Sequence, residues 1–150
     1  MDPGFLFKFY TLIVVPAWLL LAFAPRWIWT RRLVFSAWIP GMLAVAYIKA
    51  LMFALPFPEG GSFNSLEGVM ILFQTPYAVL VGWIHYLAFD LFIGAWEVRD
   101  AQRRGINHWL VVPCLFFTLM LGPIGLLMYF VLRGIVCKTV NTVELSPQDR

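Results

Sequence analysis

Charged residues are scarce in this 150-residue chain. They make up 13% of it, whereas hydrophobic residues make up 61%. A water-soluble domain of this size needs more polar surface than these residues can supply, so a soluble globular protein is excluded. The composition instead favours a helical protein embedded in a membrane, and the length allows one domain.

Sequence patterns for several common chemistries are also missing. Cys114 and Cys137 lie far apart and form no C-x-x-C pair, so the chain has no disulfide framework to interpret. It contains no glycine-rich phosphate loop, no G-x-S-x-G motif and no dinucleotide fingerprint. The net charge of +3 is small, and the basic residues of the chain lie in short clusters. We interpret these clusters as topology signals and lipid-headgroup contacts, and we expect no nucleic-acid partner.

Four apolar segments reach the length of about 20 residues that a helix needs to cross a bilayer. They cover residues 5–24, 33–55, 69–98 and 109–132. The sequence therefore predicts an all-α fold, with four transmembrane helices in a compact bundle over residues 1–138 and a short polar tail at 139–150.

The third segment is longer than one crossing requires, so we expect either its first part to lie in the interface or its end to project into water. A proline falls in every segment and removes a backbone donor there, which predicts kinks at Pro16, Pro40, Pro76, Pro113 and Pro123.

The distribution of basic residues predicts an orientation. Six arginines lie in the first and third connections: Arg26, Arg31, Arg32, Arg99, Arg103 and Arg104. Three basic residues fall on the predicted opposite side: Lys8, Arg133 and Lys138. The arginine-rich connections are thus predicted to be cytoplasmic, and both termini to lie outside.

His85 and Asp90 are the most informative residues, because ionisable side chains at bilayer depth are costly unless they face protein or water. We predict them to be catalytic. Their i,i+5 spacing does not match the i,i+3 or i,i+4 spacing of two metal ligands on one helix, so neither a metal nor a cofactor is expected. The structural alternative for His85 is a hydrogen bond to a neighbouring helix.

On an ideal helix, Asp90 and Glu97 share one face with Trp83 and Tyr86. His85 lies about 140° from Asp90, on the face that carries Gln74. We predict that Gln74, Tyr86, Trp83 and Glu97 bind the substrate. For Glu97 and the charged residues after it, the structural alternative is a solvated helix end held by pairs within the helix.

Three stretches resemble a known family. W-I-H-Y-L-A-F-D-L-F at residues 83–92, followed by Asp100, resembles a motif of the plant abscisic-acid-deficient 4 family of membrane proteins. F-Y-T-L-I-V-V-P at residues 9–16 and L-V-V-P-C-L with G-P-I-G-L-L within 110–127 resemble its flanking blocks. The resemblance covers residues 9–133.

This resemblance implies a four-helix membrane protein linked to carotenoid metabolism. Plant members are implicated in converting violaxanthin to neoxanthin, an isomerisation that opens an epoxide and leaves an allene. Such a reaction needs an acid for the epoxide oxygen and a base for a polyene proton, and His85 and Asp90 match the family motif. Only a few residues precede the first apolar segment, so we expect no transit peptide and interpret the chain as a bacterial member in the inner membrane.

Two functions follow as hypotheses. The first is a carotenoid- or isoprenoid-binding protein that acts as an isomerase by acid–base chemistry. The second is a non-enzymatic subunit or pigment scaffold of a larger complex, such as a photosynthetic one, in which His85 holds a pigment or bonds to a partner. The expected partners are a lipophilic pigment, membrane lipids, and either further copies of the chain or a larger membrane complex.

Overall fold

The computed structural model describes residues 2–36 and 38–139. Seven helical elements follow one another in this part of the chain, and it contains no strand. They are α1 (Pro3–Phe23), the π-helix η1 (Thr30–Phe35), α2 (Trp38–Ala54), α3 (Leu66–Leu72), α4 (Pro76–Arg104), α5 (His108–Leu121) and α6 (Pro123–Cys137). The predicted all-α class is confirmed. Of the predicted tail at residues 139–150, residues 140–150 lie outside the described residues.

The central element is α4, with 29 residues and a length of about 43 Å. It begins where the Thr75 hydroxyl accepts a hydrogen bond from the Ala78 amide and Pro76 takes the first turn. It ends at Gly105, whose φ of 67° suits the left-handed conformation of a helix C-terminus. Helices α1, α2, α5 and α6 all pack against it. The third apolar segment is therefore split, with the separate short helix α3 before Pro76 and a long helix after it.

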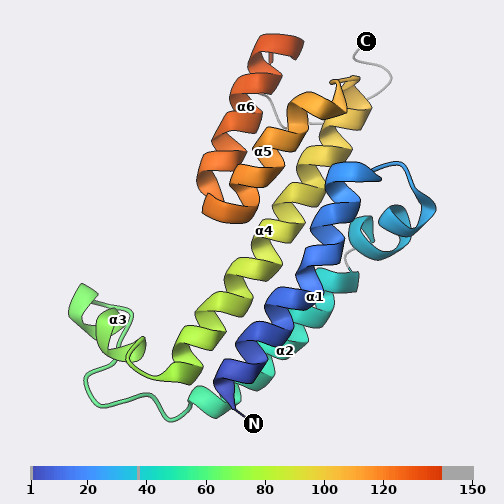
Figure 1. Ribbon diagram of the computed structural model, residues 1–150. Helices are drawn as coiled ribbons and strands as arrows, with labels where there is room; N and C mark the ends of the chain where they lie inside the picture. The colour runs from blue at the N-terminus through green and yellow to red at the C-terminus, as the bar shows by residue number, and fades with distance from the viewer. Residues whose placement is uncertain (1, 37, 140–150) are drawn as a thin grey trace, which may run out of the picture.

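Helices α1 and α2 run along α4 and make few contacts with each other (Figure 1). Their buried side chains meet those of α4 in one hydrophobic core. Small residues of α2 form part of it, since Ala46 and Ala50 are almost fully buried. Close packing of α2 on α4 follows from these small side chains.

The fourth apolar segment is a helical hairpin, not one crossing. Helices α5 and α6 have 14 and 15 residues and pack side by side at the upper end of α4 (Figure 1). The chain reverses at Gly122, whose φ is 41°, and Pro123 then begins α6 without needing a backbone donor. The backbones approach so closely that a Cβ atom on Gly125 would collide with the backbone of Thr118.

The predicted bundle of four transmembrane helices is not confirmed. Among the described residues, α1 and α4 are the helices long and apolar enough to cross a membrane. The second segment is divided between η1 and a 17-residue α2, and each arm of the hairpin is shorter still.

The beginning of α1 and the end of α6 lie at opposite ends of the molecule (Figure 1). Because the fourth segment turns back on itself, the two ends of the described chain are separated along the long axis. The prediction that both termini share one side is therefore not supported.

The prolines play two different roles. Pro16 and Pro113 lie inside α1 and α5, as predicted. Pro76 and Pro123 instead occupy the first turns of α4 and α6, where no intrahelical donor is lost, and Pro40 lies in the first turn of α2. The prediction that every one of these prolines interrupts a helix was wrong for these three positions.

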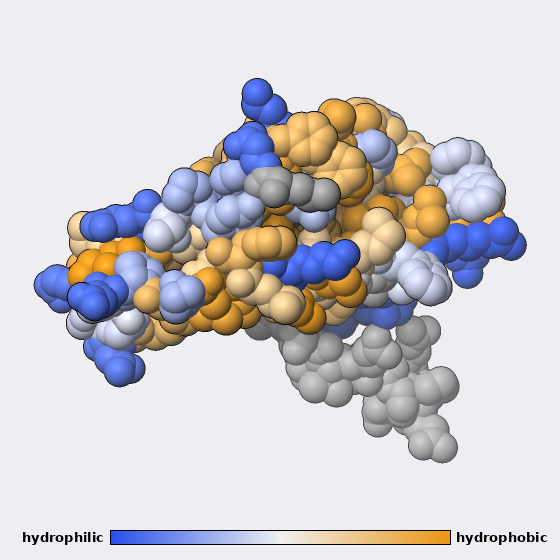
Figure 2. All heavy atoms as spheres, turned by 90° about the horizontal axis from the view of Figure 1, so that it is seen from below, coloured by the Kyte–Doolittle hydropathy of each residue, from blue (hydrophilic) through white to orange (hydrophobic). Residues whose placement is uncertain are grey.

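Large hydrophobic side chains cover much of the outer surface. Leu12, Met52 and Ile135 are each about 70% exposed, and they lie on three different helices. Figure 2, a view from below, shows hydrophobic residues over most of the visible face and hydrophilic ones gathered mainly at its margins. An exposed apolar surface of this extent marks contact with lipid or with another protein.

Substituting Gly125 tests the hairpin. We expect Gly125→Ala to lower the free energy of unfolding by about 1–3 kcal/mol, because the added methyl group overpacks the contact with Thr118. Denaturant unfolding in mild detergent, followed by far-UV circular dichroism, measures the change. Gly41→Ala is the matched control: a Cβ there meets nothing within 4 Å, so stability should change by less than about 1 kcal/mol. Equal effects at both sites would contradict the close approach of α5 and α6.

Candidate functional site

A groove of about 530 Å³ opens between α1, α4 and α5. Most of its lining is apolar, and α1 and α4 each supply polar groups. The lining residues are Thr11, Val14, Val15, Trp18, Trp83, Tyr86, Leu87, Leu119 and Met120. Its volume lies within the usual range for small-molecule sites, about 300–1,000 Å³, and its mixture of an apolar wall with few polar groups is typical of them.

Hydrogen bonds hold the aromatic side chains of this groove in place. The Trp83 indole donates to Thr11 Oγ1 over 2.9 Å, which joins α4 to α1. The Tyr86 hydroxyl donates to the Leu119 carbonyl over 2.6 Å, which joins α4 to α5. Trp83 and Tyr86 also stack, with their ring centres 5.4 Å apart. The groove is thus a defined feature between three helices.

Asp90 lies one turn beyond Tyr86, against the turn between α5 and α6. A Cβ atom on Gly122 would come within 2.9 Å of Asp90 Oδ1, and the φ of 41° at Gly122 also favours glycine there. The Tyr86 hydroxyl is close enough to interact with the Asp90 carboxylate. Asp90 Oδ2 is buried and, among the described residues, has no hydrogen-bond partner.

The groove also contains an unused donor. Trp18 lines it and is 5% exposed, and its indole Nε1 is buried without a partner in the described part of the chain. A buried polar group left unpaired costs about 1–3 kcal/mol. The Trp18 donor and the Asp90 acceptor are therefore groups that a bound molecule with polar atoms would satisfy.

Above Asp90, polar side chains between α4, α5 and α6 form a buried cluster. The Thr118 hydroxyl donates to Glu97 Oε1 over 3.0 Å, and both residues are fully buried. The Tyr129 hydroxyl donates to Asp100 Oδ2 over 2.7 Å, and Arg133 Nη1 lies 3.3 Å from the same oxygen. The Arg133 side chain has no exposed surface, so its charge is balanced inside the protein.

This cluster was not predicted from the sequence. The sequence predicts Arg133 on the outer side. For the charged residues from Glu97 onward, the structural alternative is a helix end exposed to solvent. In the structure, Arg133 reaches Asp100 at the upper end of α4, and Glu97 and Asp100 are buried. The sequence signal was an arginine within an apolar stretch, which requires a buried acidic partner.

His85 lies on another face of α4. Its ring stacks on Phe89 at 4.5 Å between centres and lies 6.1 Å from the ring of Tyr47 on α2. It lines a separate apolar pocket of about 280 Å³ between α2, α4 and the α3 region. The His85 side chain is exposed, as is Gln74, which precedes α4 and so is not on its face.

The structure therefore brings some of the predicted site residues together and separates others. Trp83, Tyr86 and Asp90 follow one face of α4, and Glu97 continues it into the buried cluster. His85 and Gln74 lie outside this group. For His85 this agrees with the angle of about 140° from Asp90 that an ideal helix predicts. Within residues 2–36 and 38–139, no three His, Cys, Asp or Glu side chains are grouped as metal ligands would be.

The fold and site define an all-helical protein in which an apolar groove is lined by a tyrosine that lies beside a carboxylate. The family model for ABA DEFICIENT 4-like proteins matches residues 5–129, which include every residue of the groove and most of the buried cluster. The chain belongs to the ABA DEFICIENT 4-like family. No curated protein and no solved structure was found to match it.

Removing the buried arginine tests the cluster. We expect Arg133→Met to lower the free energy of unfolding by about 1–3 kcal/mol, because the Asp100 carboxylate loses its fully buried partner while Arg104 Nε, 3.0 Å from Asp100 Oδ1, still pairs with it. Arg103 approaches the same carboxylate at 3.7 Å, but its side chain is 49% exposed. Arg103→Met should therefore cost less than about 1 kcal/mol. Unfolding in detergent measures both variants, and equal costs would show that Arg133 is not buried against Asp100.

Proposed function

We propose that the protein binds a carotenoid or a similar isoprenoid in the groove between α1, α4 and α5 and isomerises it. One observation carries the proposal: the apolar groove is lined by Trp18 and Tyr86, and Asp90 lies beside Tyr86. Among the described residues, the buried Trp18 indole donor and the buried Asp90 Oδ2 have no hydrogen-bond partner. A long apolar molecule with a few polar atoms satisfies both groups. Membership of the ABA DEFICIENT 4-like family supports the same chemistry.

The proposed location is a bacterial inner membrane. Two apolar helices and a largely hydrophobic outer surface support it. Ten Lys and Arg residues are described, and two of them, Lys8 and Lys49, lie away from the upper end. The other eight lie in the connection after α1, in η1, in the C-terminal part of α4 and in the C-terminal part of α6 or just after it: Arg26, Arg31, Arg32, Arg99, Arg103, Arg104, Arg133 and Lys138. The upper end is therefore cytoplasmic in this proposal, and the beginning of α1 lies outside.

The proposed chemistry uses Asp90 with Tyr86 in place of Asp90 with His85. The Asp90 carboxylate removes a proton from a polyene carbon, and the Tyr86 hydroxyl, turning from the Leu119 carbonyl, gives its proton to the epoxide oxygen. The C–O bond breaks as the new carbon–carbon double bond forms. Proton transfer from Asp90 back to Tyr86 then restores both groups, so the reaction is an isomerisation without a cofactor.

The variant Asp90→Asn tests this reaction. It keeps the size of the side chain but cannot accept the proton, so we expect conversion to fall by at least about 100-fold while pigment binding and folding are retained. Pigment extraction from purified protein and chromatography of carotenoids from cells expressing each variant measure binding and conversion. A matched control is His85→Gln, which lies in the other pocket and should leave conversion unchanged.

A colourless wild-type preparation together with an unchanged carotenoid profile would contradict the proposal. Loss of conversion in His85→Gln but not in Asp90→Asn would place the chemistry in the pocket beside α2 instead.

A non-enzymatic pigment scaffold is the second candidate, and the position of His85 favours it. The imidazole is exposed on the outer surface between aromatic side chains, where a planar pigment from outside has access to its nitrogen. In this case His85→Gln would remove the pigment, Asp90→Asn would keep it, and native purification would yield a stoichiometric partner complex.

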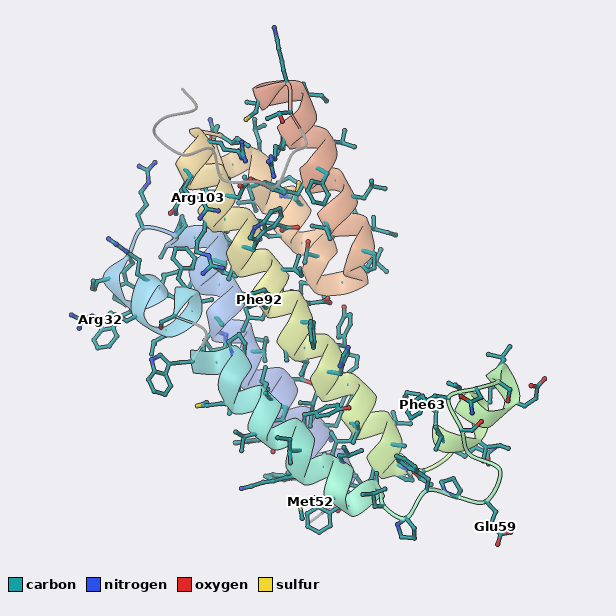
Figure 3. All side chains as sticks on the ribbon, turned by 180° about the vertical axis from the view of Figure 1, so that it is seen from behind. Arg32, Met52, Glu59, Phe63, Phe92 and Arg103 are labelled. Carbon is teal, nitrogen blue, oxygen red and sulfur yellow. The ribbon has the colours of Figure 1, made fainter. Side chains whose placement is uncertain are left out.

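Thiol accessibility tests the proposed orientation. In a variant lacking Cys114 and Cys137, we expect Ser62→Cys to react with a membrane-impermeant maleimide in intact spheroplasts, because residue 62 lies between α2 and α3 at the lower end. Arg103→Cys, at the upper end (Figure 3), should react only after permeabilisation. The reverse pattern would invert the orientation, and labelling of both residues from outside would exclude a spanning arrangement.

A further inference from the structure

A basic groove lies at the upper end of the molecule, outside the site described above. It has a volume of about 540 Å³ and is lined by Arg26, Arg31, Phe35, Arg99, Gln102 and Arg103. Four of these residues are arginines, and none of the described lining residues is acidic. Arg103 makes a long ion pair with Asp100, at 3.7 Å. The groove is therefore strongly positive.

Hydrogen bonds attach the segment that supplies Arg26 and Arg31 to the helices around it. The Thr30 hydroxyl donates to the Ala24 carbonyl over 2.6 Å, and the Gln102 side chain of α4 donates to the Pro25 carbonyl over 3.2 Å. Both bonds tie the connection between α1 and η1 in place. The arginines are thus supplied by an ordered segment of the chain.

The guanidinium of Arg99 is also positioned by its neighbours. Its Nη1 donates to the Phe35 carbonyl over 3.0 Å, and its Cζ lies 5.8 Å from the centre of the Phe35 ring. These contacts place the Arg99 charge at the wall of the groove. Since guanidinium groups bind phosphate oxygens in a bidentate geometry, arginines converging from two segments form a suitable anion site.

A second hollow, of about 620 Å³, adjoins the basic groove and shares Arg26 and Gln102 with it. Its other lining residues are mainly apolar, with Phe23, Trp27 and Trp109 among them, and Asn107 and His108 are polar members of the lining. Trp27 and Trp109 are 52% and 66% exposed, as tryptophans at the headgroup level of a membrane are. A positive groove that continues into an apolar one matches a molecule with a phosphate at the head and a hydrocarbon chain behind it.

We propose that this pair of grooves is a binding site for one anionic phospholipid. Arg26, Arg31 and Arg99 bind the phosphate, and an acyl chain lies along the hollow beside Trp27 and Trp109. This site is separate from the groove that contains Tyr86, and the proposal does not depend on pigment binding or turnover.

The test uses the purified full-length chain in a neutral detergent, with phosphatidic acid titrated in and bound lipid counted by native mass spectrometry. We expect one phosphatidic acid to bind in preference to phosphatidylcholine. Arg26→Gln combined with Arg31→Gln should weaken that binding about thirty-fold, because both charges face the phosphate. The matched control is Arg32→Gln with Lys138→Gln, which removes the same charge near the same end. Arg32 stacks on Trp29 instead of lining the groove, so affinity should change less than three-fold.

Competition separates a lipid site from a simple anion site. Inorganic phosphate at a few millimolar should not displace the lipid, since it lacks the chain that occupies the hollow. Displacement by phosphate alone would overturn the lipid assignment and leave a site for free phosphate. Equal weakening in the two double variants would show diffuse attraction and overturn the site itself, as would equal binding of phosphatidylcholine. Far-UV circular dichroism of each variant confirms that a loss of binding is not a loss of folding.

Discussion

The buried Asp100 carboxylate constrains the whole upper half of the molecule. Arg133 of α6 has no exposed surface, and an ionised side chain in an apolar interior needs a close partner of opposite charge. Asp100, which also pairs with Arg104 on its own helix and accepts from the Tyr129 hydroxyl, is that partner. For Arg133 to reach α4, the chain must reverse after α5. Gly122 permits the reversal, and the same turn then covers Asp90 and helps to close the groove beside Tyr86. One buried charge pair thus links the fold to the candidate site.

Much of the α4 face could be predicted from the sequence. Helical periodicity placed Trp83, Tyr86, Asp90 and Glu97 together, and the structure directs them toward α1, α5 and the hairpin turn. Periodicity succeeds here because α4 is a long, uninterrupted helix, along which side-chain direction follows from residue spacing alone. The separation of His85 from Asp90 followed from the same spacing.

The hairpin could not be predicted in the same way. Hydropathy measures the apolar length of a segment and does not distinguish one crossing from two short helices that fold back on each other. Arg133 and Asp100 are 33 positions apart, so no local pattern joins them. The sequence did contain two relevant signals, a glycine–proline pair in the middle of the segment and an arginine near its end. Either one is commonplace, and only their combination specifies a turn that buries a charge.

Because α5 and α6 are about half as long as α4, the two sides of the molecule differ in height. Beyond the hairpin turn, α1 and α4 continue toward the lower end past α5 and α6 (Figure 1). If the protein binds a long apolar ligand as proposed, such a ligand would enter from the side, with one end beneath Gly122 and the rest along the exposed faces of α1 and α4. A molecule too short to contact these faces while its end is at Asp90 would then lose most of the apolar contact, so the proposed site would select its ligand by length.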